Sequence, residues 1–341
     1  MPADKKGGEQ EMNSIIIDAY SHISPLKYTE FIKEKYPSMY NNLLGACVPL
    51  YDMDTRFRIM DKFPEVVQVL TIGPVPPIEY FANKRQTVEL AKMANDEMAE
   101  LCLKYHDRFV AAIALLPMNN INAALKETDR AIRDLGFRGI YVHSNINGKP
   151  LDAPEFLPLW EKMARYDLPV YIHPWRPMEF SDYATEKESK YYIATNFGWP
   201  YETTVAMTRL IFSGILDKCP GLKIVTHHCG GMVSFYAGRI YQHYGTQLGN
   251  VKDIAKTPLE YYKMFYTDTA IHGNTPALML AHDFWGPDKL LFGADLPLGD
   301  SFWGSRSYRV TINAINDMKI TDEDKEKIFA DNARKLLRIP I

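Results

Sequence analysis

The sequence predicts an α/β protein, a (β/α)8 TIM barrel with an insertion after its first strand. The first observation is that eight short, β-rich apolar runs are spread over the 341 residues. The second is that amphipathic, helix-like stretches lie between these runs. Near-continuous apolar runs are typical of parallel strands buried on both faces, and their alternation with helices favours this barrel.

The eight apolar runs are the expected strands, in chain order: Ile15–Ile17, Val66–Leu70, Phe109–Ala114, Gly139–Val142, Val170–Ile172, Ile224–Thr226, Met264–Tyr266 and Leu290–Phe292. The clearest expected helices are Gln86–Tyr105, Ile121–Leu135, Pro154–Tyr166 and Thr203–Lys218. Some of these end at Gly or Pro, as helices often do. The segment Ser24–Tyr51, rich in Tyr, Pro and Asn, is the insertion, and we expect it to be a lid.

Composition indicates an enzyme-sized protein and excludes several other classes. Residues 1–13 are charged and small and predict a disordered leader, so residues 14–341 are expected to form one barrel domain. With a net charge of −3 and no basic run, nucleic acid is not an expected partner. No apolar stretch approaches the roughly 20 residues that cross a bilayer. Four widely separated cysteines predict no structural disulfides and a cytoplasmic location.

Histidines and aspartates gather where the expected strands end, which is where barrel enzymes carry their chemistry. Five of the nine histidines lie at such positions. They are His22, His143, His173, His227 and His228, and they are joined by Asp268 after strand seven and Asp295 after strand eight. Imidazole and carboxylate together suit Zn²⁺, Mn²⁺ or Fe²⁺, so the pattern predicts a divalent metal site.

The same segments resemble the amidohydrolase superfamily. Ile17–Ile23 resembles its first-strand D-x-H-x-H motif, Tyr171–Pro174 its fifth-strand histidine, Leu222–Gly231 its sixth-strand histidine followed by glycines, and Phe292–Pro297 its eighth-strand aspartate. The resemblance is closest to the branch of aminocarboxymuconate-semialdehyde decarboxylase and the hydroxybenzoate-type decarboxylases. Phe197–Thr203 and Gly238–Ile240 also match that branch, and the likeness runs from Ile15 to Leu337.

The resemblance implies a set of metal ligands and catalytic groups. One metal would be held at Tyr20, His22, His173 and Asp295. His228 would be the acid/base group beside the metal, with His227 one residue behind it. Arg239 matches an arginine that reaches the substrate carboxylate of a neighbouring subunit, which implies at least a dimer.

Tyr20 departs from the family pattern, because a histidine is expected there. In one interpretation it is a pocket residue, which leaves His22, His173 and Asp295, alone or completed by Asp18. In a second it binds as phenolate to iron or manganese, with His228 helping to hold a second ion, as in dinuclear amidohydrolase-like oxygenases. In a third the barrel is an altered partner subunit of an active homologue.

Four neighbouring residues have weaker expectations. Adjacent strand residues point to opposite faces, so His228 is expected to face the metal and His227 to enter the barrel wall as a structural residue. His143 could ligate a second ion or be structural. Asp268 is expected to cap the chain or orient a histidine, and Cys229 to pack as a small residue.

The expected function is non-oxidative decarboxylation of a small carboxylate substrate. His228 and Asp295 are the candidate catalytic residues, and the candidate carboxylate clamps are Arg56, Arg58, Arg176 and Arg239. Trp199 and Trp175 could form an apolar wall. Hydroxylation by a dinuclear iron or manganese oxygenase, hydrolysis, and a non-catalytic partner subunit remain alternatives. The chain itself is expected to form a homodimer or a hetero-oligomer with a related barrel chain.

Overall fold

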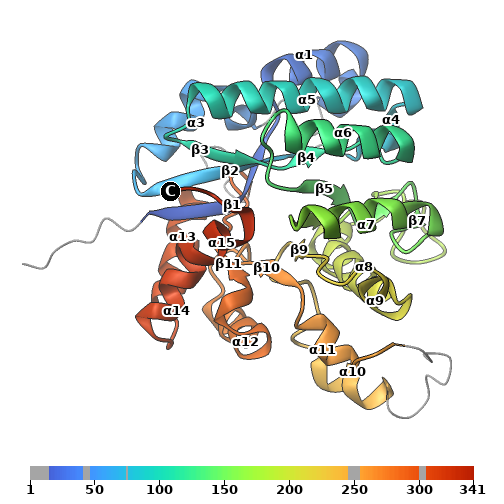
Figure 1. Cartoon of the computed structure of the whole chain (residues 1–341), viewed down its shortest axis with the longest axis vertical. Coiled ribbons are helices and arrows are strands. Elements are labelled where there is room, and N and C mark those ends of the chain that lie inside the picture. Colours follow the sequence, from blue (N-terminus) through green and yellow to red (C-terminus); the bar gives the residue numbers. More distant parts are fainter. Residues whose placement is uncertain (1–14, 41–46, 74–75, 245–253, 299–304) are drawn as a thin grey trace, which may run out of the picture.

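The strands of the described chain form one barrel, and the helices lie outside it (Figure 1). The computed structural model describes residues 15–40, 47–73, 76–244, 254–298 and 305–341. The barrel strands are β1 (Ile16–Ile23), β2 (Val66–Ile72), β3 (Phe109–Ala112), β4 (Ala114–Leu115), β5 (Ile140–His143), β8 (Val170–His173), β9 (Ile224–Thr226), β10 (Tyr266–Asp268) and β11 (Leu290–Leu291). β3 and β4 share the third barrel position, so the expected strand number is confirmed.

All the barrel strands pair in parallel, and the first and last strands close the ring. The order is β1-β2-β3 in one sheet and β11-β10-β9-β8-β5-β4 in the other. Ile113 separates β3 from β4, and its amide donates to the Leu70 carbonyl at 2.9 Å, so the wall is continuous there. Across the seam from β11 to β1, the Ala19 amide donates to Phe292 O at 2.8 Å. The predicted (β/α)8 barrel is therefore confirmed.

Helices follow most strands and cover the barrel. α5 begins with a capping box in which Asn83 and Gln86 bond each other's backbone amides. The helical segments are α1 (Leu26–Lys35), α2 (Pro37–Met39), η2 (Val48–Leu50), α3 (Met53–Met60), α4 (Ile78–Phe81), α5 (Lys84–Lys104), α6 (Ile121–Arg133), η3 (Pro154–Phe156), α7 (Leu157–Tyr166), η4 (Ala194–Gly198), α8 (Trp199–Phe212), α9 (Ile215–Lys218), α10 (Ala237–Tyr244), α11 (Pro258–Tyr262), α12 (Thr275–Trp285), η5 (Pro287–Lys289), α13 (Ser305–Asn316), α14 (Asp322–Glu326), η6 (Lys327–Asp331) and α15 (Asn332–Leu337). A short hairpin, β6 (Asn145–Ile146) and β7 (Lys149–Pro150), follows β5.

Several expected boundaries differ from the structure by one or more residues, and three of these differences have a clear cause. β1 runs on to Ile23 because its polar residues pair with β2 and with the β11 side, instead of leaving the strand. The seventh strand begins at Tyr266, two residues later than expected, and so includes Asp268. The expected helix Thr203–Lys218 is two helices, since Gly214 between them has the left-handed φ of +72° that glycine adopts readily.

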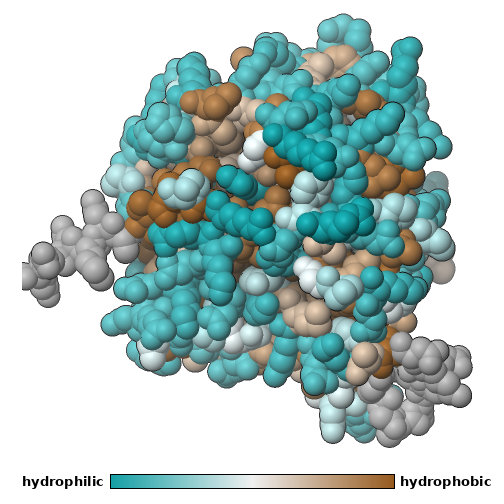
Figure 2. All heavy atoms as spheres, in the orientation of Figure 1, coloured by the Kyte–Doolittle hydropathy of each residue, from teal (hydrophilic) through white to brown (hydrophobic). Residues whose placement is uncertain are grey.

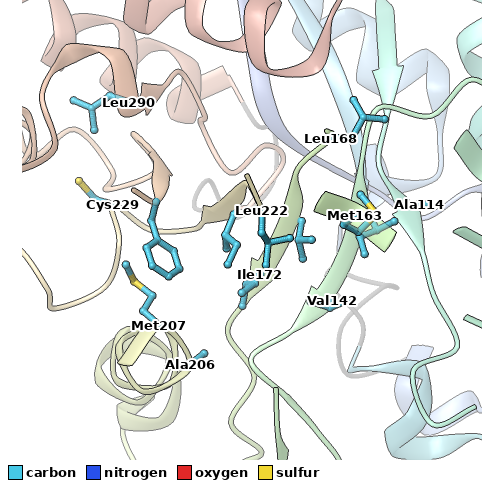
Figure 3. Packing of buried hydrophobic residues seen from close by; sticks show 14 of the residues in the cluster. Ala114, Val142, Met163, Leu168, Ile172, Ala206, Met207, Leu222, Cys229 and Leu290 are labelled. Atoms are coloured by element: carbon cyan, nitrogen blue, oxygen red, sulfur yellow. The ribbon is translucent and has the colours of Figure 1, made fainter. Parts of the chain in front are cut away.

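Alternate strand residues enter two separate layers of the core, as the two-residue period of a strand requires. In β8, Val170 and Ile172 belong to the cluster that packs against the helices, whereas Tyr171 belongs to the other cluster. Figure 3 shows Ile172 between Met207 of α8 and Met163 of α7. The outer face in Figure 2 is mostly hydrophilic, with scattered hydrophobic patches, because the apolar sides of the helices face the barrel.

The insertion after β1 is anchored to helix α5. The amides of Lys27 and Tyr28 donate to the two oxygens of Glu97 at 2.9 and 2.8 Å. The expected leader, residues 1–13, and residues 41–46 of the expected lid lie outside the described residues. The four cysteines are free, as expected. Within the described ranges, no helix is both long and apolar enough to span a membrane.

Candidate metal and active site

Five predicted site residues come together at one end of the barrel. Tyr20 and His22 lie on β1, His173 ends β8, His228 follows β9, and Asp295 follows β11. All five are buried, apart from a small exposed part of His228. The His173 ring centroid lies 5.4 Å from that of His22 and 5.7 Å from that of His228. The His228 Nε2 atom is 3.8 Å from Asp295 Oδ2.

Backbone carbonyls fix the orientation of two histidines in this cluster. The Nδ1 atom of His22 lies 3.1 Å from Ile72 O, and the Nδ1 atom of His173 lies 2.7 Å from Pro174 O. A carbonyl only accepts hydrogen bonds, so Nδ1 is the protonated nitrogen in both rings. The Nε2 atoms therefore carry the free lone pairs, which is the usual arrangement of metal-binding histidines.

The His22 lone pair faces a carboxylate instead of a second donor. Its Nε2 accepts a hydrogen bond from the Tyr20 hydroxyl at 2.9 Å and lies 3.3 Å from Asp295 Oδ1. That carboxylate oxygen is buried and has no hydrogen bond within the described residues. Two electron-rich atoms at this separation repel each other unless a cation lies beside both. The donor set therefore fits a divalent metal ion.

The same side chains do not already surround a space of the size of a metal ion. Among the described residues, no three His, Cys, Asp or Glu side chains already have the donor arrangement of a metal site. The cluster is closed on itself by the hydrogen bond between Tyr20 and His22 and by the contact of His22 with Asp295. An ion would have to replace this direct contact between His22 and Asp295.

The negative charge of Asp295 and the positive charge of protonated His228 stabilise each other. Burial alone would raise the pKa of Asp295, but the neighbouring imidazoles of His22 and His228 outweigh burial and hold that pKa well below its usual range. Burial likewise acts to lower the pKa of His228, and the neighbouring Asp295 raises it above the ordinary histidine value. Asp295 is therefore a stable anion, and its charge favours the protonated form of His228.

The backbone around the site is strained where the ligands emerge. His228 and Asp295 have φ values of +53° and +57°, a left-handed region that non-glycine residues rarely adopt. Gly293 lets β11 approach its neighbours, since a Cβ atom there would lie 2.9 Å from Tyr20 Cβ and 3.0 Å from Asp268 Cβ. Strain of this kind, held by a packed barrel, is typical of functional sites.

His227 does not enter the barrel wall, so that part of the expectation was wrong, but its buried contacts agree with the structural role that was expected. β9 ends at Thr226, and the strand alternation on which the expectation rested no longer applies to the two histidines. The His227 ring stacks on the Tyr20 ring at 3.6 Å, and its Nδ1 lies 2.8 Å from Asp268 Oδ2. Asp268 thus orients a histidine, as expected, and His227 supports Tyr20 from inside the barrel.

The other expectations for this region have mixed outcomes. Both oxygens of Asp18 accept hydrogen bonds, from the Tyr308 hydroxyl at 2.9 Å and from the Tyr20 amide at 3.1 Å, so its part in the ligand set stays a prediction. Cys229 is buried in the apolar core, as expected for a packing residue, and burial raises the pKa of its thiol. His143 is buried at the end of β5, and its ring lies 5.7 Å from that of His173.

Arg56 is a structural residue, so the expectation that it clamps a substrate carboxylate was wrong. Its guanidinium is fully buried and donates to Gln68 Oε1 at 2.8 Å, to His22 O at 2.7 Å and to Ser21 Oγ at 2.7 Å. These bonds fix the part of β1 that contains Ser21 and His22. Arg58, two residues along α3, is exposed.

The remaining predicted substrate residues lie beside the cluster or away from it. The Trp199 ring lies 5.3 Å from that of His173 and stacks at 6.2 Å on that of His228, and its buried Nε1 has no partner in the described chain. Arg176 pairs with Glu202 at 3.3 Å. Arg239 is exposed on α10, and no contact joins it to the cluster within the described part of this chain.

Comparison with known proteins decides the family. The amidohydrolase family model matches residues 51–339. The chain belongs to the amidohydrolase family. It is 28% identical to the 2-amino-3-carboxymuconate-6-semialdehyde decarboxylase of Dictyostelium discoideum over 95% of this chain and 92% of that one. It is 29% identical to the gamma-resorcylate decarboxylase of a Rhizobium species, over 84% and 87% of the two chains.

A solved amidohydrolase structure extends the comparison to the fold. The dihydroxybenzoic acid decarboxylase of Polaromonas, solved with manganese and the inhibitor 2-nitroresorcinol, superposes with a TM-score of 0.80. The alignment has 25% identity and covers 96% of this chain and 98% of that one. The resemblance to the decarboxylase branch is thereby confirmed. The family match begins after β1, so it leaves Tyr20 and His22 outside.

Proposed function

We propose that this amidohydrolase is a metal-dependent decarboxylase that removes carbon dioxide from a small, planar carboxylic acid without oxidising it. One observation carries the proposal: the lone pair of buried His22 faces an unpartnered carboxylate oxygen of Asp295, a pair that needs a cation. Relatives named for resorcylate and aminocarboxymuconate decarboxylation support the reaction class.

His22, His173 and Asp295 would hold the metal ion, with Tyr20 and His228 beside it. Imidazole and carboxylate donors suit zinc, manganese or iron, and the manganese of the Polaromonas relative makes manganese the first ion to test. A bound divalent ion supplies a Lewis acid for an oxygen of the substrate. We propose one ion per chain, because His22, His173 and Asp295 supply one set of two imidazoles and one carboxylate.

The side chains around the ion would complete the reaction. The bond between the substrate carbon and its carboxylate breaks, carbon dioxide leaves, and the electron pair stays on that carbon. His228 then delivers a proton to the carbon, and solvent restores the proton. Asp295, 3.8 Å away, keeps His228 protonated, and Trp199 provides an apolar wall with one donor. Arg176 is the proposed carboxylate clamp within the chain.

The proposal is tested with manganese-loaded protein and 2,6-dihydroxybenzoate, measuring carbon dioxide release and metal content. His228→Asn should lower the rate by roughly 100-fold to 10,000-fold with bound manganese unchanged. The control, His106→Asn, changes an exposed histidine in the turn between α5 and β3 and should leave the rate unchanged. A wild-type rate in His228→Asn, or no decarboxylation of any of a panel of hydroxybenzoates, would contradict the proposal.

A second candidate function is oxygenation with two iron or manganese ions. The observation in its favour is that the Tyr20 hydroxyl lies 2.9 Å from His22 Nε2, within the ligand cluster. Burial raises the pKa of Tyr20 well above 10, which favours a neutral phenol that donates a hydrogen bond over a phenolate ligand. Two ions per chain and a visible absorption band lost in Tyr20→Phe would favour the oxygenase; one ion and no band would favour the decarboxylase.

We further propose that two copies of the chain form a homodimer. Large aromatic side chains are exposed in the segment after β8, at the start of α8 and around α10, the helix that carries Arg239: Phe180, Tyr183, Tyr191, Tyr192, Phe197, Tyr201, Phe235, Tyr236 and Tyr241. Exposed apolar surface of this extent is typical of an interface. Light scattering should give twice the chain mass, and Tyr241→Glu should reduce it. A single-chain mass, or co-purification with a different barrel chain, would contradict the homodimer.

A further inference from the structure

Helix α13 contacts strand β1 through a hydrogen bond from Tyr308 to Asp18. Tyr308 is fully buried, and its ring lies 6.2 Å from that of Phe292, just after β11, and 5.3 Å from that of Phe63. The Tyr308 hydroxyl donates to Asp18 Oδ2 at 2.9 Å and accepts from Gln68 Nε2 at 2.6 Å. Because the hydroxyl both donates and accepts, its direction is fixed as well as that of the ring.

Asp18 joins the two backbone segments that carry the proposed metal ligands. Its Oδ1 atom accepts from the Tyr20 amide at 3.1 Å and, in a longer bond, from the Ala294 amide at 3.4 Å. Tyr20 lies two residues before His22 on β1, and Ala294 directly precedes Asp295. One carboxylate oxygen therefore bonds to both sides of the seam between β1 and β11, while Tyr308 holds the other oxygen.

The contact between Tyr308 and Asp18 is part of a longer chain of buried hydrogen bonds. Arg56 donates to Gln68 Oε1 at 2.8 Å, and Gln68 in turn donates to Tyr308. Arg56 also donates to the His22 carbonyl at 2.7 Å, so the chain begins and ends on β1. The side chains of Arg56, Gln68, Tyr308 and Asp18 are all fully buried. In such a satisfied buried network, each member fixes the direction of the next.

The metal cluster depends on the separation that this network sets. The His22 Nε2 atom and Asp295 Oδ1 lie 3.3 Å apart, on the two segments that Asp18 joins. Metal ligands must be held to within about 0.5 Å of their working positions. We infer that Tyr308 and Asp18 are positioning residues, which keep His22 and Asp295 where they can share one ion. The inference rests on the proposed function, which takes these two residues as metal ligands.

The test is a calorimetric titration of manganese into metal-free protein, without substrate. Tyr308→Phe should bind manganese roughly tenfold more weakly than the wild type, a typical effect of losing a group that orients a ligand. The electron paramagnetic resonance spectrum of the bound manganese should also change, because it reports the geometry of the ligands. Phenylalanine can keep the ring contacts of Tyr308, so the variant should fold. An unchanged affinity and spectrum would overturn the inference.

Tyr261→Phe is the matched control for a buried phenol that is lost elsewhere. The Tyr261 hydroxyl, on the outer helix α11, also donates to a carboxylate, that of Asp217, and accepts from the Ala255 amide at 2.9 Å. This variant should lose stability as Tyr308→Phe does but keep its manganese affinity. An equal loss of affinity in both variants would show that general destabilisation weakens the site, and would overturn the positioning role.

Two substitutions of Asp18 separate positioning from direct metal binding. Asp18→Asn retains an acceptor oxygen for the Tyr20 and Ala294 amides and should keep most of its manganese affinity, whereas Asp18→Ala should lose roughly 10-fold to 100-fold. If asparagine and alanine weaken binding equally, Asp18 acts through its charge on the ion and the inference is overturned. A wild type that binds no manganese would refute the proposed function and the inference together, whereas manganese binding without decarboxylation would count against the proposed function alone.

Discussion

Arg56→Ala separates a structural arginine from a substrate clamp. The guanidinium makes three short hydrogen bonds, to Gln68 Oε1, His22 O and Ser21 Oγ, and all of these groups are buried. The substitution removes the donor and leaves the acceptors without partners. We therefore expect a large loss of stability and, through His22, a weaker metal site.

The magnitude follows from the burial of this network. Breaking a buried, charged hydrogen-bond network by removing one member costs about 3–5 kcal/mol. With an unfolding entropy of about 2.1 cal/mol/K per residue, a chain of 341 residues should then melt about 4–7 °C lower. Arg58→Ala, two residues away on the exposed side of α3, should shift the melting temperature by less than about 1 °C.

Calorimetry gives the melting temperatures, and benzoate binding to the manganese-loaded variants gives the affinity. For Arg56→Ala we expect the lower melting temperature. If that variant has the melting temperature of the wild type and loses only its affinity for benzoate, then Arg56 contacts the substrate and the structural assignment is refuted.

Three further predictions concern the metal, the pH dependence of stability and the barrel packing. Asp295→Asn should lose most of its bound manganese on dialysis, measured by elemental analysis, because the amide removes the anion of the cluster; retention at the wild-type level would contradict this. Burial raises the pKa of Glu79 from 4.5 to about 7, so its protonated form stabilises the fold at low pH, and that contribution is lost as the pH rises from about 4.5 to about 7. Glu79→Gln should remove this decline, roughly 3 kcal/mol between pH 5 and 8 in urea unfolding, and an unchanged pH slope would count against it. Gly293→Ala should cost about 1–3 kcal/mol of stability, since its Cβ would lie 2.9 Å from Tyr20 Cβ; an unaltered urea midpoint would show that the strands can separate.

The barrel could be predicted from the sequence because each of its strands is a short apolar run. Because the apolar runs mark where β5, β8, β9 and β11 end, the sequence also predicted the polar residues at those ends: His143, His173, His228 and Asp295. β1 was harder, since Asp18–His22 is largely polar and stays in the strand only through partners distant in the sequence.

Side-chain roles that depend on distant partners could not be predicted. Arg56 looks like any surface arginine until Gln68 and the His22 carbonyl are placed around it. His227 was assigned by strand alternation, which fails where β9 ends and the backbone turns left-handed at His228. Tyr28 lies in the insertion, and no local pattern signals that its hydroxyl is buried without a hydrogen-bond partner in the described residues.

The seam between β11 and β1 determines when the cluster can form as the chain is synthesised and folds. His22 comes from the first strand and Asp295 from the last, and the two meet only when the Ala19 and His22 amides bond to Phe292 and Leu296. During synthesis, more than 270 residues are added after His22 before Asp295 is made. If His22 and Asp295 hold the metal as proposed, metal retention would report barrel closure, and a chain that lacks the last strand would retain no metal.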